Sequence, residues 1–321
     1  MEKIKIISCE KGERLVKEVA KILKVVLVGE KKIVFSNNEI FARPLESVSD
    51  SEAVFVFQCF SQHVNDELME LFILLDALRR SHAQQIFVVL PYFPYARQDT
   101  VSEPRAPVTA AMIARILEML GMYSLITICF HARQEQGFFW GPVDNLSLRT
   151  VFADVFKKEI GIKNPLVVAP DAGIGNEAKK FAHLIGGDVI VLSKERIAPN
   201  QVEALPMPLD IKGRECVIFE DMVDTGGTIE ATVKVLRENE VSKEMYLIAT
   251  HPILSGPAIE KLRWAGFKKI VFSDTIKIPN EKLLHLLSDI KIVSVAELLA
   301  QVIACRAQRK PLGDVYKYEE R

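Results

Sequence analysis

Residues 217–228 read VIFEDMVDTGGT, the pattern of a buried strand followed by a polar turn and the start of a helix. A short apolar run ends in two adjacent acids, Glu220 and Asp221, and a turn with two glycines then leads into a helical pattern. Glycines let backbone N–H groups approach a ligand closely, and those groups form an anion site with the hydroxyls and the helix N-terminus. A phosphate fits this turn, and the two carboxylates can accept hydrogen bonds from the hydroxyls of an attached sugar. A plain strand-to-helix turn would explain the glycines but not the acids before them.

Strand and helix patterns alternate on both sides of this stretch. We expect strands at residues 4–8, 32–35, 53–58, 86–90, 124–130, 166–169, 188–192, 215–220, 244–250 and 269–273. We expect helices at residues 11–23, 64–80, 107–120, 148–160, 173–185, 227–239, 256–265 and 295–307. Continuous apolar runs such as IFVVL at 86–90 indicate strands that are buried on both faces. The alternation predicts the α/β class, with parallel sheets flanked by helices.

The two halves of the chain share a pattern in which buried strands end in polar turns. These turns are 91–100 and 131–137 in the first half, and 171–175 and 220–228 in the second. Ligands of open α/β sheets bind outside the carboxyl ends of the strands, so the four turns are the candidate site. We place a domain boundary near residue 145, with the last helix free to pack against either half.

Composition limits the class of protein. A chain of 321 residues is long enough for about two domains, each with its own core. Lys plus Arg is 41 and Asp plus Glu is 42, so a basic excess of the kind that coats nucleic acid is absent. Five scattered cysteines without a CxxC pair predict reduced thiols in a cytoplasmic protein. We expect no signal peptide and no membrane span, because no apolar run of about 18 residues occurs.

The 217–228 stretch resembles the phosphoribosyl pyrophosphate loop of type I phosphoribosyltransferases. Further segments narrow the resemblance to the ribose-phosphate pyrophosphokinase family, and they are PYFPYARQD at 91–99, HARQEQGFF at 131–139, PVDN at 142–145, PDAG at 170–173, and Thr250-His251 with LSGPA at 254–258. These motifs keep the family's order and spacing over nearly the whole chain.

The resemblance implies two tandem phosphoribosyltransferase-like domains, each a mainly parallel sheet flanked by helices. Residues 1–145 would form the ATP side, and residues 146–321 would carry the ribose 5-phosphate loop. The implied reaction transfers the diphosphoryl group of Mg·ATP to the 1-hydroxyl of ribose 5-phosphate, giving phosphoribosyl pyrophosphate and AMP. Such a transfer depends on positioned cations around a charge-rich transition state more than on covalent catalysis.

Roles of single residues also follow from the resemblance. Lys194 would be a point charge on the transferring group and Arg196 a fork for phosphate oxygens, although KER on its own would be a solvated cluster. His131 and Asp171 would hold Mg²⁺, with the histidine acting in part indirectly, because Mg²⁺ prefers oxygen ligands. The implied ATP contacts are Phe35, Asn37, Asn38, Glu39, Arg97, Gln98 and Asp99. The implied ribose 5-phosphate contacts are Glu220, Asp221, Asp224, Thr225, Gly226, Gly227 and Thr228.

The family also implies a homo-oligomer, commonly a hexamer built from dimers. In that assembly the 35–39 segment reaches the adenine of a neighbouring subunit. No nucleic-acid or membrane partner is expected.

Several functional turns depart from the family pattern. Asn37-Asn38 replaces Asp-Gly, Thr100-Val101 replaces a basic pair, Cys129 stands where an acid precedes the histidine, and Glu177 stands where an arginine is expected. Glu220 in place of Asp is a mild change. We favour a working but divergent pyrophosphokinase, because the predicted catalytic and metal residues and the DTGGT turn survive together. These residues are Lys194, Arg196, His131 and Asp171. The alternative is a weakly active or inactive regulatory paralog that binds ligands. A plain phosphoribosyltransferase would not require the YARQD segment or a second domain.

Overall fold

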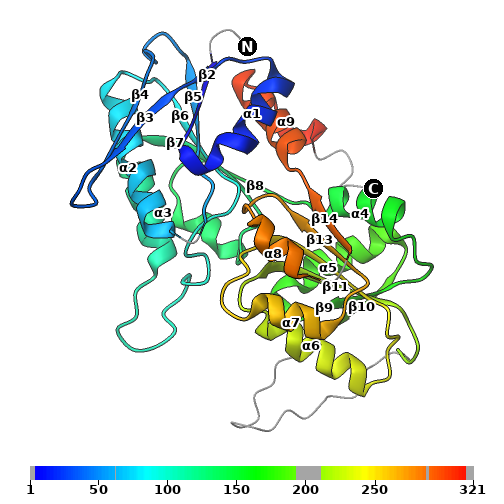
Figure 1. The fold of residues 1–321 in the computed structure, drawn as a ribbon. Coiled ribbons are helices and arrows are strands. Elements are labelled where there is room, and N and C mark those ends of the chain that lie inside the picture. Colours follow the sequence, from blue (N-terminus) through cyan, green and yellow to red (C-terminus); the bar gives the residue numbers. More distant parts are fainter. Residues whose placement is uncertain (1–3, 62, 193–210, 287–288, 316–321) are drawn as a thin grey trace. The chain divides into compact units, whose positions relative to one another are not determined.

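A computed structural model describes residues 4–61, 63–192, 211–286 and 289–315. The chain divides into two compact units. Unit 1 consists of Met1–Leu146, Thr275–Lys277 and Ser294–Arg321, and unit 2 consists of Ser147–Asp274 and Ile278–Val293. The last helix, α9 (Ala296–Ala307), therefore belongs to the first unit (Figure 1).

The described residues of unit 1 form a six-stranded parallel sheet and an antiparallel hairpin. In spatial order the sheet strands are β2 (Leu27–Val28), β1 (Ile4–Ser8), β5 (Ala53–Phe57), β6 (Ile86–Leu90), β7 (Met122–Ile128) and β8 (Val143–Leu146). The hairpin strands are β3 (Glu30–Val34) and β4 (Ile40–Pro44). Besides α9, the helices are α1 (Glu13–Leu23), α2 (Val64–Arg80) and α3 (Thr109–Met119), with short 3-10 turns at Glu10–Gly12, Arg133–Phe138 and Leu312–Asp314.

The described residues of unit 2 form a second six-stranded parallel sheet. Its spatial order is β10 (Asp188–Val191), β9 (Leu166–Ala169), β11 (Cys216–Val223), β12 (Met245–Pro252), β13 (Lys269–Ser273) and β14 (Asp289–Val293). Its helices are α4 (Arg149–Glu159), α5 (Ala172–Ile185), α6 (Gly227–Glu238), α7 (Ala258–Ala265) and α8 (Asn280–His285).

The two sheets share one topology. With the hairpin set aside, each unit orders its strands second, first, third, fourth, fifth and sixth along the chain. The order reverses between β1 and β5 in unit 1, and between β9 and β11 in unit 2. Such a switch point is where open α/β sheets bind ligands, outside the carboxyl ends of the strands. The predicted α/β class with parallel sheets is confirmed.

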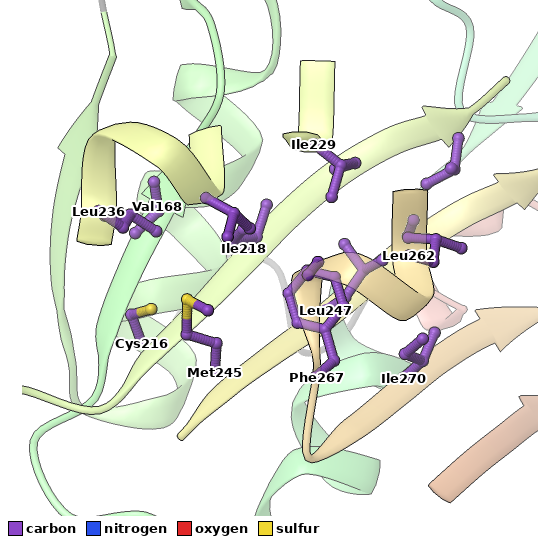
Figure 2. Packing of buried hydrophobic residues seen from close by; sticks show 14 of the residues in the cluster. Val168, Cys216, Ile218, Ile229, Leu236, Met245, Leu247, Leu262, Phe267 and Ile270 are labelled. Carbon is purple, nitrogen blue, oxygen red and sulfur yellow. The ribbon is translucent and has the colours of Figure 1, made fainter. Parts of the chain in front are cut away.

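The core of unit 2 fixes the position of the DTGGT turn. All eight residues of β11 and all eight of β12 are buried, as expected for central strands covered on both faces. Figure 2 shows Ile229 and Leu236 of α6 and Leu262 of α7 in this apolar cluster. Each side chain of this size contributes roughly 1.5–3 kcal/mol when fully buried. The starts of α6 and α7 are therefore held firmly beside the ends of β11 and β12.

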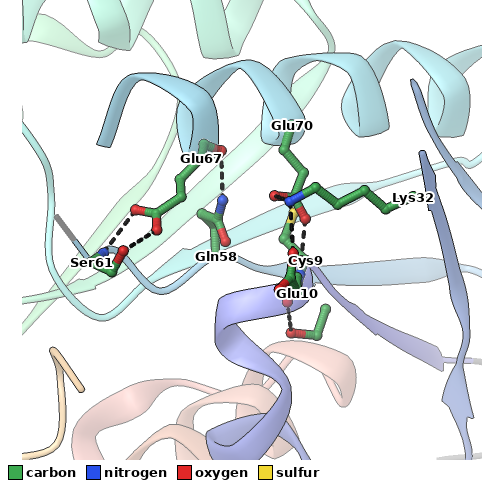
Figure 3. Close-up of polar contacts among 8 residues, drawn as sticks. Cys9, Glu10, Lys32, Gln58, Ser61, Glu67 and Glu70 are labelled. Atoms are coloured by element: carbon green, nitrogen blue, oxygen red, sulfur yellow. Dashed lines mark hydrogen bonds and ion pairs between the residues drawn. The ribbon is translucent and has the colours of Figure 1, made fainter. Parts of the chain in front are cut away.

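An ion cluster in unit 1 joins Lys32 of β3 to Glu10, which follows β1, and to Glu70 of α2 (Figure 3). Lys32 Nζ lies 2.8 Å from Glu10 Oε2 and 2.7 Å from Glu70 Oε2, and the Glu70 side chain is fully buried. Glu30 and Cys9 complete the cluster, with their ligand atoms within 4.8 Å of those of Glu70. The lysine thus already supplies a positive charge among these acids.

The structure corrects several expected elements. The patterns missed four strands and one helix, β2, β4, β8, β14 and α8. The strand expected at 32–35 is Glu30–Val34, and the strand expected to end at Glu220 continues to Val223. Both acids of the opening stretch therefore lie inside β11, and the turn itself is limited to residues 224–226.

Candidate active site

Strand β11 carries the carboxylate pair into a buried position. Glu220 and Asp221 are 5% and 6% exposed, and the strand pairs in parallel with β12 from Cys216 to Val223. Glu220 Oε1 accepts a hydrogen bond from the Asp221 N–H at 3.0 Å, and Asp221 Oδ1 accepts one from the Met222 N–H at 2.6 Å. Burial, followed by the charge of Asp221, raises the pKa of Glu220 well above its usual range. The pair therefore resists carrying two negative charges unless a cation or hydrogen-bond donors are nearby.

The turn after β11 requires a glycine at one position. Gly226 has φ of 72° and is the N-cap of α6, so the chain enters the helix through a left-handed residue. Gly227 is the first helical residue, and Thr228 follows it. Backbone N–H groups of the first helical turn have no partner within the helix, and the helix dipole favours a negative charge there. The geometry is that of an anion site, as the sequence predicts.

The LSGPA segment after β12 braces this turn. The Leu254 N–H donates to the Val223 carbonyl at 2.9 Å, and the Ser255 N–H donates to the Asp224 carbonyl at 3.0 Å. The Ser255 hydroxyl also hydrogen-bonds Asp224 Oδ1. These bonds hold the backbone and the side chain of Asp224 in one orientation.

Asp171 follows β9, on the other side of the switch point. Its Oδ1 accepts hydrogen bonds from the N–H groups of Gly173 at 2.9 Å and Ile174 at 3.4 Å, so it is the N-cap of α5. The charge of Asp171 also contributes to the raised pKa of Glu220. The carboxyl groups of Asp171, Glu220 and Asp221 are therefore close enough to interact electrostatically. Unit 2 thus brings together Asp171, the acid pair and the DTGGT turn.

In unit 1 the structure packs two of the predicted turns against each other. Gln134 Nε2 donates to Asp99 Oδ2 at 2.8 Å, and the ring of Phe93 meets those of Phe130 and Phe139 edge-on at 5.5 and 5.7 Å. Buried Phe93 therefore belongs to the core of unit 1. The turn with Asp99 and the turn that begins at His131 form one surface of unit 1.

The remaining predicted residues of these two turns are exposed or brace the chain. Arg97 and His131 are exposed. Gln98 is exposed too, but its Oε1 accepts a hydrogen bond from the Thr109 hydroxyl at 2.6 Å, at the start of α3. Cys129, one of the departures from the family, has φ of 49° directly before this surface.

The tip of the β3–β4 hairpin holds the 35–39 segment. Phe35 is 49% exposed, and Asn37, Asn38 and Glu39 are exposed as well. Asn38 has φ of 66°, a left-handed conformation that asparagine tolerates, so the loss of the family's glycine leaves the turn intact. The Phe35 N–H donates to the Glu39 carbonyl at 2.8 Å and closes the tip.

Two further predictions have different outcomes. Lys194 and Arg196 lie outside the described residues, and their roles stay predictions. Glu177, found where the family has an arginine, forms an ion pair with Arg149 at 2.7 Å within unit 2. Sequence reasoning missed this pair, and it also missed Lys261 on α7, although Lys261 lies only three residues beyond the LSGPA motif.

The two similar parallel sheets, with an acid pair and a Thr-Gly-Gly-Thr turn at the switch point of the second, define the phosphoribosyltransferase-like class. Two family models match the chain. The model for the N-terminal domain of ribose phosphate pyrophosphokinase matches residues 4–121, and the model for the phosphoribosyl synthetase-associated domain matches residues 195–317. The chain belongs to the ribose-phosphate pyrophosphokinase family.

Relatives of known name cover most of the chain. A ribose-phosphate pyrophosphokinase of Helicobacter hepaticus is 40% identical over 89% of this chain and 90% of its own length. Ribose-phosphate pyrophosphokinase 1 of Lactococcus lactis is 36% identical over 98% and 96%. The crystal structure of phosphoribosylpyrophosphate synthetase from Mycobacterium smegmatis matches with a TM-score of 0.86 and 33% identity, over 95% of this chain and 99% of that one.

Proposed function

We propose that the chain is a ribose-phosphate diphosphokinase that transfers the diphosphoryl group of ATP to the 1-hydroxyl of ribose 5-phosphate. The products are phosphoribosyl pyrophosphate, a precursor in nucleotide biosynthesis, and AMP. The observation that carries the proposal is the geometry of β11 and α6. Buried Glu220 and Asp221 stand directly before a turn whose left-handed Gly226 opens the N-terminus of α6.

In this proposal the turn at 224–228 binds the 5-phosphate and the acid pair binds the ribose hydroxyls. Backbone N–H groups and the hydroxyls of Thr225 and Thr228 would donate hydrogen bonds to the phosphate oxygens. Hydroxyl donors from the sugar would stabilise the ionised form of a carboxyl group whose pKa is otherwise raised. The 1-hydroxyl would then be held in one place for attack, which is the main contribution that a protein makes to phosphoryl transfer.

The residues of unit 2 fit a magnesium ion. Asp171 and the Glu220–Asp221 pair offer hard carboxylate oxygens, the ligands that Mg²⁺ prefers. Burial is the largest cause of the raised pKa of Glu220, and the charges of Asp221 and Asp171 raise it further. His131 and Asp171 would hold the ion as the family resemblance implies. When bound, Mg²⁺ neutralises charge on the polyphosphate.

The cations for the transferring group are expected outside the described residues. Lys194 and Arg196 are proposed to contact the diphosphoryl group, and Arg97 and Gln98 the ATP phosphates or base. Asp99 orients its turn through its hydrogen bond from Gln134. Phe35, Asn37, Asn38 and Glu39 are proposed to reach the adenine.

We also propose a homo-oligomer in which the hairpin tip serves a neighbouring copy. Two exposed apolar side chains on the hairpin support the oligomer, since a neighbouring copy could cover them. Ile33 and Phe41 are paired across β3 and β4 and are 37% and 38% exposed. Light scattering of the purified protein tests this assembly.

No helix among the described residues is long and apolar enough to cross a membrane.

The activity is tested by following AMP after ribose 5-phosphate and Mg·ATP are mixed with the protein. We expect AMP to form only when ribose 5-phosphate is present. The rate of AMP formation should fall by orders of magnitude in Lys194→Ala. AMP no greater than that of the Lys194→Ala control would leave the regulatory alternative as the better account.

A further inference from the structure

Helix α7 packs its first turns directly against the phosphate turn. A Cβ added at Gly226 would lie 3.4 Å from Ala258 Cα and 3.3 Å from Lys261 Cβ. The segment just before α7 is joined to the turn by the Ser255 N–H, which donates to the Asp224 carbonyl at 3.0 Å. The stem of Lys261 therefore starts in contact with the turn.

The ammonium group of Lys261 lies close to the first residue of α6. Apart from its chain neighbours and the backbone of its own helix, a Cβ added at Gly227 would have two neighbours within 4 Å among the described residues, Lys261 Nζ at 3.7 Å and Thr225 Oγ1 at 3.8 Å. The lysine and the threonine hydroxyl thus flank the same space over the first residue of α6. Thr225 is one of the groups proposed to hold the phosphate.

The charges around the turn call for a cation at this place. Carboxylate charge at the turn and directly before it, on Asp224 and the Glu220–Asp221 pair, would repel a phosphate dianion even if the pair carries a single negative charge. A lysine ammonium is a compact charge with three donors on a flexible stem, so it can reach a phosphate oxygen without backbone movement.

Glu230 on α6 leaves the lysine available for this task. Lys261 Nζ lies 3.2 Å from Glu230 Oε2, while Lys234 Nζ lies 2.8 Å from Glu230 Oε1. When Lys261 turns to a ligand, Glu230 keeps Lys234 as a partner. The exchange therefore leaves no unpaired acid behind.

We propose that Lys261 binds the terminal phosphate of the sugar phosphate held by the turn at 224–228. The inference deepens the proposed function and rests on it. Lys261 acts in substrate binding, at the end of the sugar remote from the reacting hydroxyl. The LSGPA motif then has a role, because it fixes α7, and with it the lysine, beside the turn.

Steady-state kinetics of the full-length protein with Mg·ATP test the proposal. Lys261→Met keeps the stem that packs on Gly226 and removes the charge. We expect KM for ribose 5-phosphate to rise about 10- to 100-fold, the range of a lost charge-assisted hydrogen bond, while KM for ATP stays within about twofold. Lys261→Arg should recover part of the affinity, since it restores the charge.

Lys234→Met is the matched control, because it removes the other cation of Glu230 and lies farther along α6. We expect its KM for ribose 5-phosphate to stay within about twofold of the wild type. Equal effects of Lys234→Met and Lys261→Met would overturn the proposal, since the pairing of Glu230 would then be the common cause.

Calorimetric titration with ribose 5-phosphate alone separates this inference from the proposed reaction. Weaker binding by Lys261→Met than by Lys234→Met supports the inference even if no AMP forms. Equal binding by wild type and Lys261→Met refutes it even if the enzyme is active.

Discussion

The substitution Gly226→Ala tests the geometry of the phosphate turn, and Gly227→Ala is its neighbour and control. Gly226 has φ of 72°, which costs an alanine about 1–2 kcal/mol. The added methyl group would also lie 3.3 Å from Lys261 Cβ and 3.4 Å from Ala258 Cα, where the backbone of α7 cannot easily move. Together these effects should lower the free energy of unfolding by about 2 kcal/mol, or the melting temperature of a unit of this size by ~4–8 °C.

Gly227→Ala should behave differently. Gly227 has helical backbone, and its added Cβ would lie no closer than 3.7 Å to any group other than its chain neighbours and its own helix backbone. Its stability should be unchanged or raised by up to about 1 kcal/mol, the helix preference of alanine over glycine.

The two tryptophans allow unit 2 to be followed on its own. Trp264 lies in α7, and the Cζ atom of Arg237 lies 4.5 Å from the centre of its ring. Trp140 lies in unit 1 and is 88% exposed. In a Trp140→Phe background, urea unfolding monitored by Trp264 fluorescence therefore reports unit 2. Equal losses of stability in the two alanine variants would refute the account of this turn.

Further predictions concern charges and the nucleotide tip. Burial and the charge of Glu70 raise the pKa of Glu30 to about 8, so the folded state retains a proton that the unfolded state loses above pH 4.5. The free energy of unfolding should therefore fall as pH rises from about 4.5 to 8, and Glu30→Gln should flatten this slope in urea titrations. An equal slope in the wild type and Glu30→Gln would contradict the raised pKa. Burial would raise the pKa of Glu177, but the hydrogen bond and charge of Arg149 hold it below its usual range. Arg149→Met should cost about 3 kcal/mol, because it removes the nearest cation of a partly buried acid. Lys180 lies farther from Glu177, at 3.8 Å, and a cost of Arg149→Met near that of Lys180→Met would contradict the importance of the Arg149 pair. The double substitution Asn37→Asp with Asn38→Gly restores the family's Asp-Gly and should lower KM for ATP severalfold in steady-state assays. An unchanged KM would show that the hairpin tip does not contact the nucleotide.

The parts of the fold that local pattern dictates were predictable from the sequence. Val64–Arg80 has helical periodicity, and Ile86–Leu90 is a continuous apolar run, so both were predicted with the bounds that the structure has. Strands β4 and β8 were missed, because Pro44 and Asp144 interrupt their apolar patterns and pairing with neighbouring strands decides the outcome.

The candidate site shows the same limit. The acids of β11 end an apolar pattern at Glu220, but pairing with β12 carries the strand to Val223. The DTGGT turn was visible, since glycine and hydroxyl residues have strong local meaning. The approach of Lys261 to Gly227 joins two helices and follows from packing, which no local pattern encodes.

The central claim is the transfer of a diphosphoryl group, and ³¹P NMR of one reaction mixture tests it most directly. With ribose 5-phosphate and Mg·ATP, we predict that AMP and phosphoribosyl pyrophosphate appear in a 1:1 ratio as ATP disappears, without ADP as an intermediate. Formation of ADP and inorganic phosphate, or AMP without a new pyrophosphate ester of the sugar, would contradict the account.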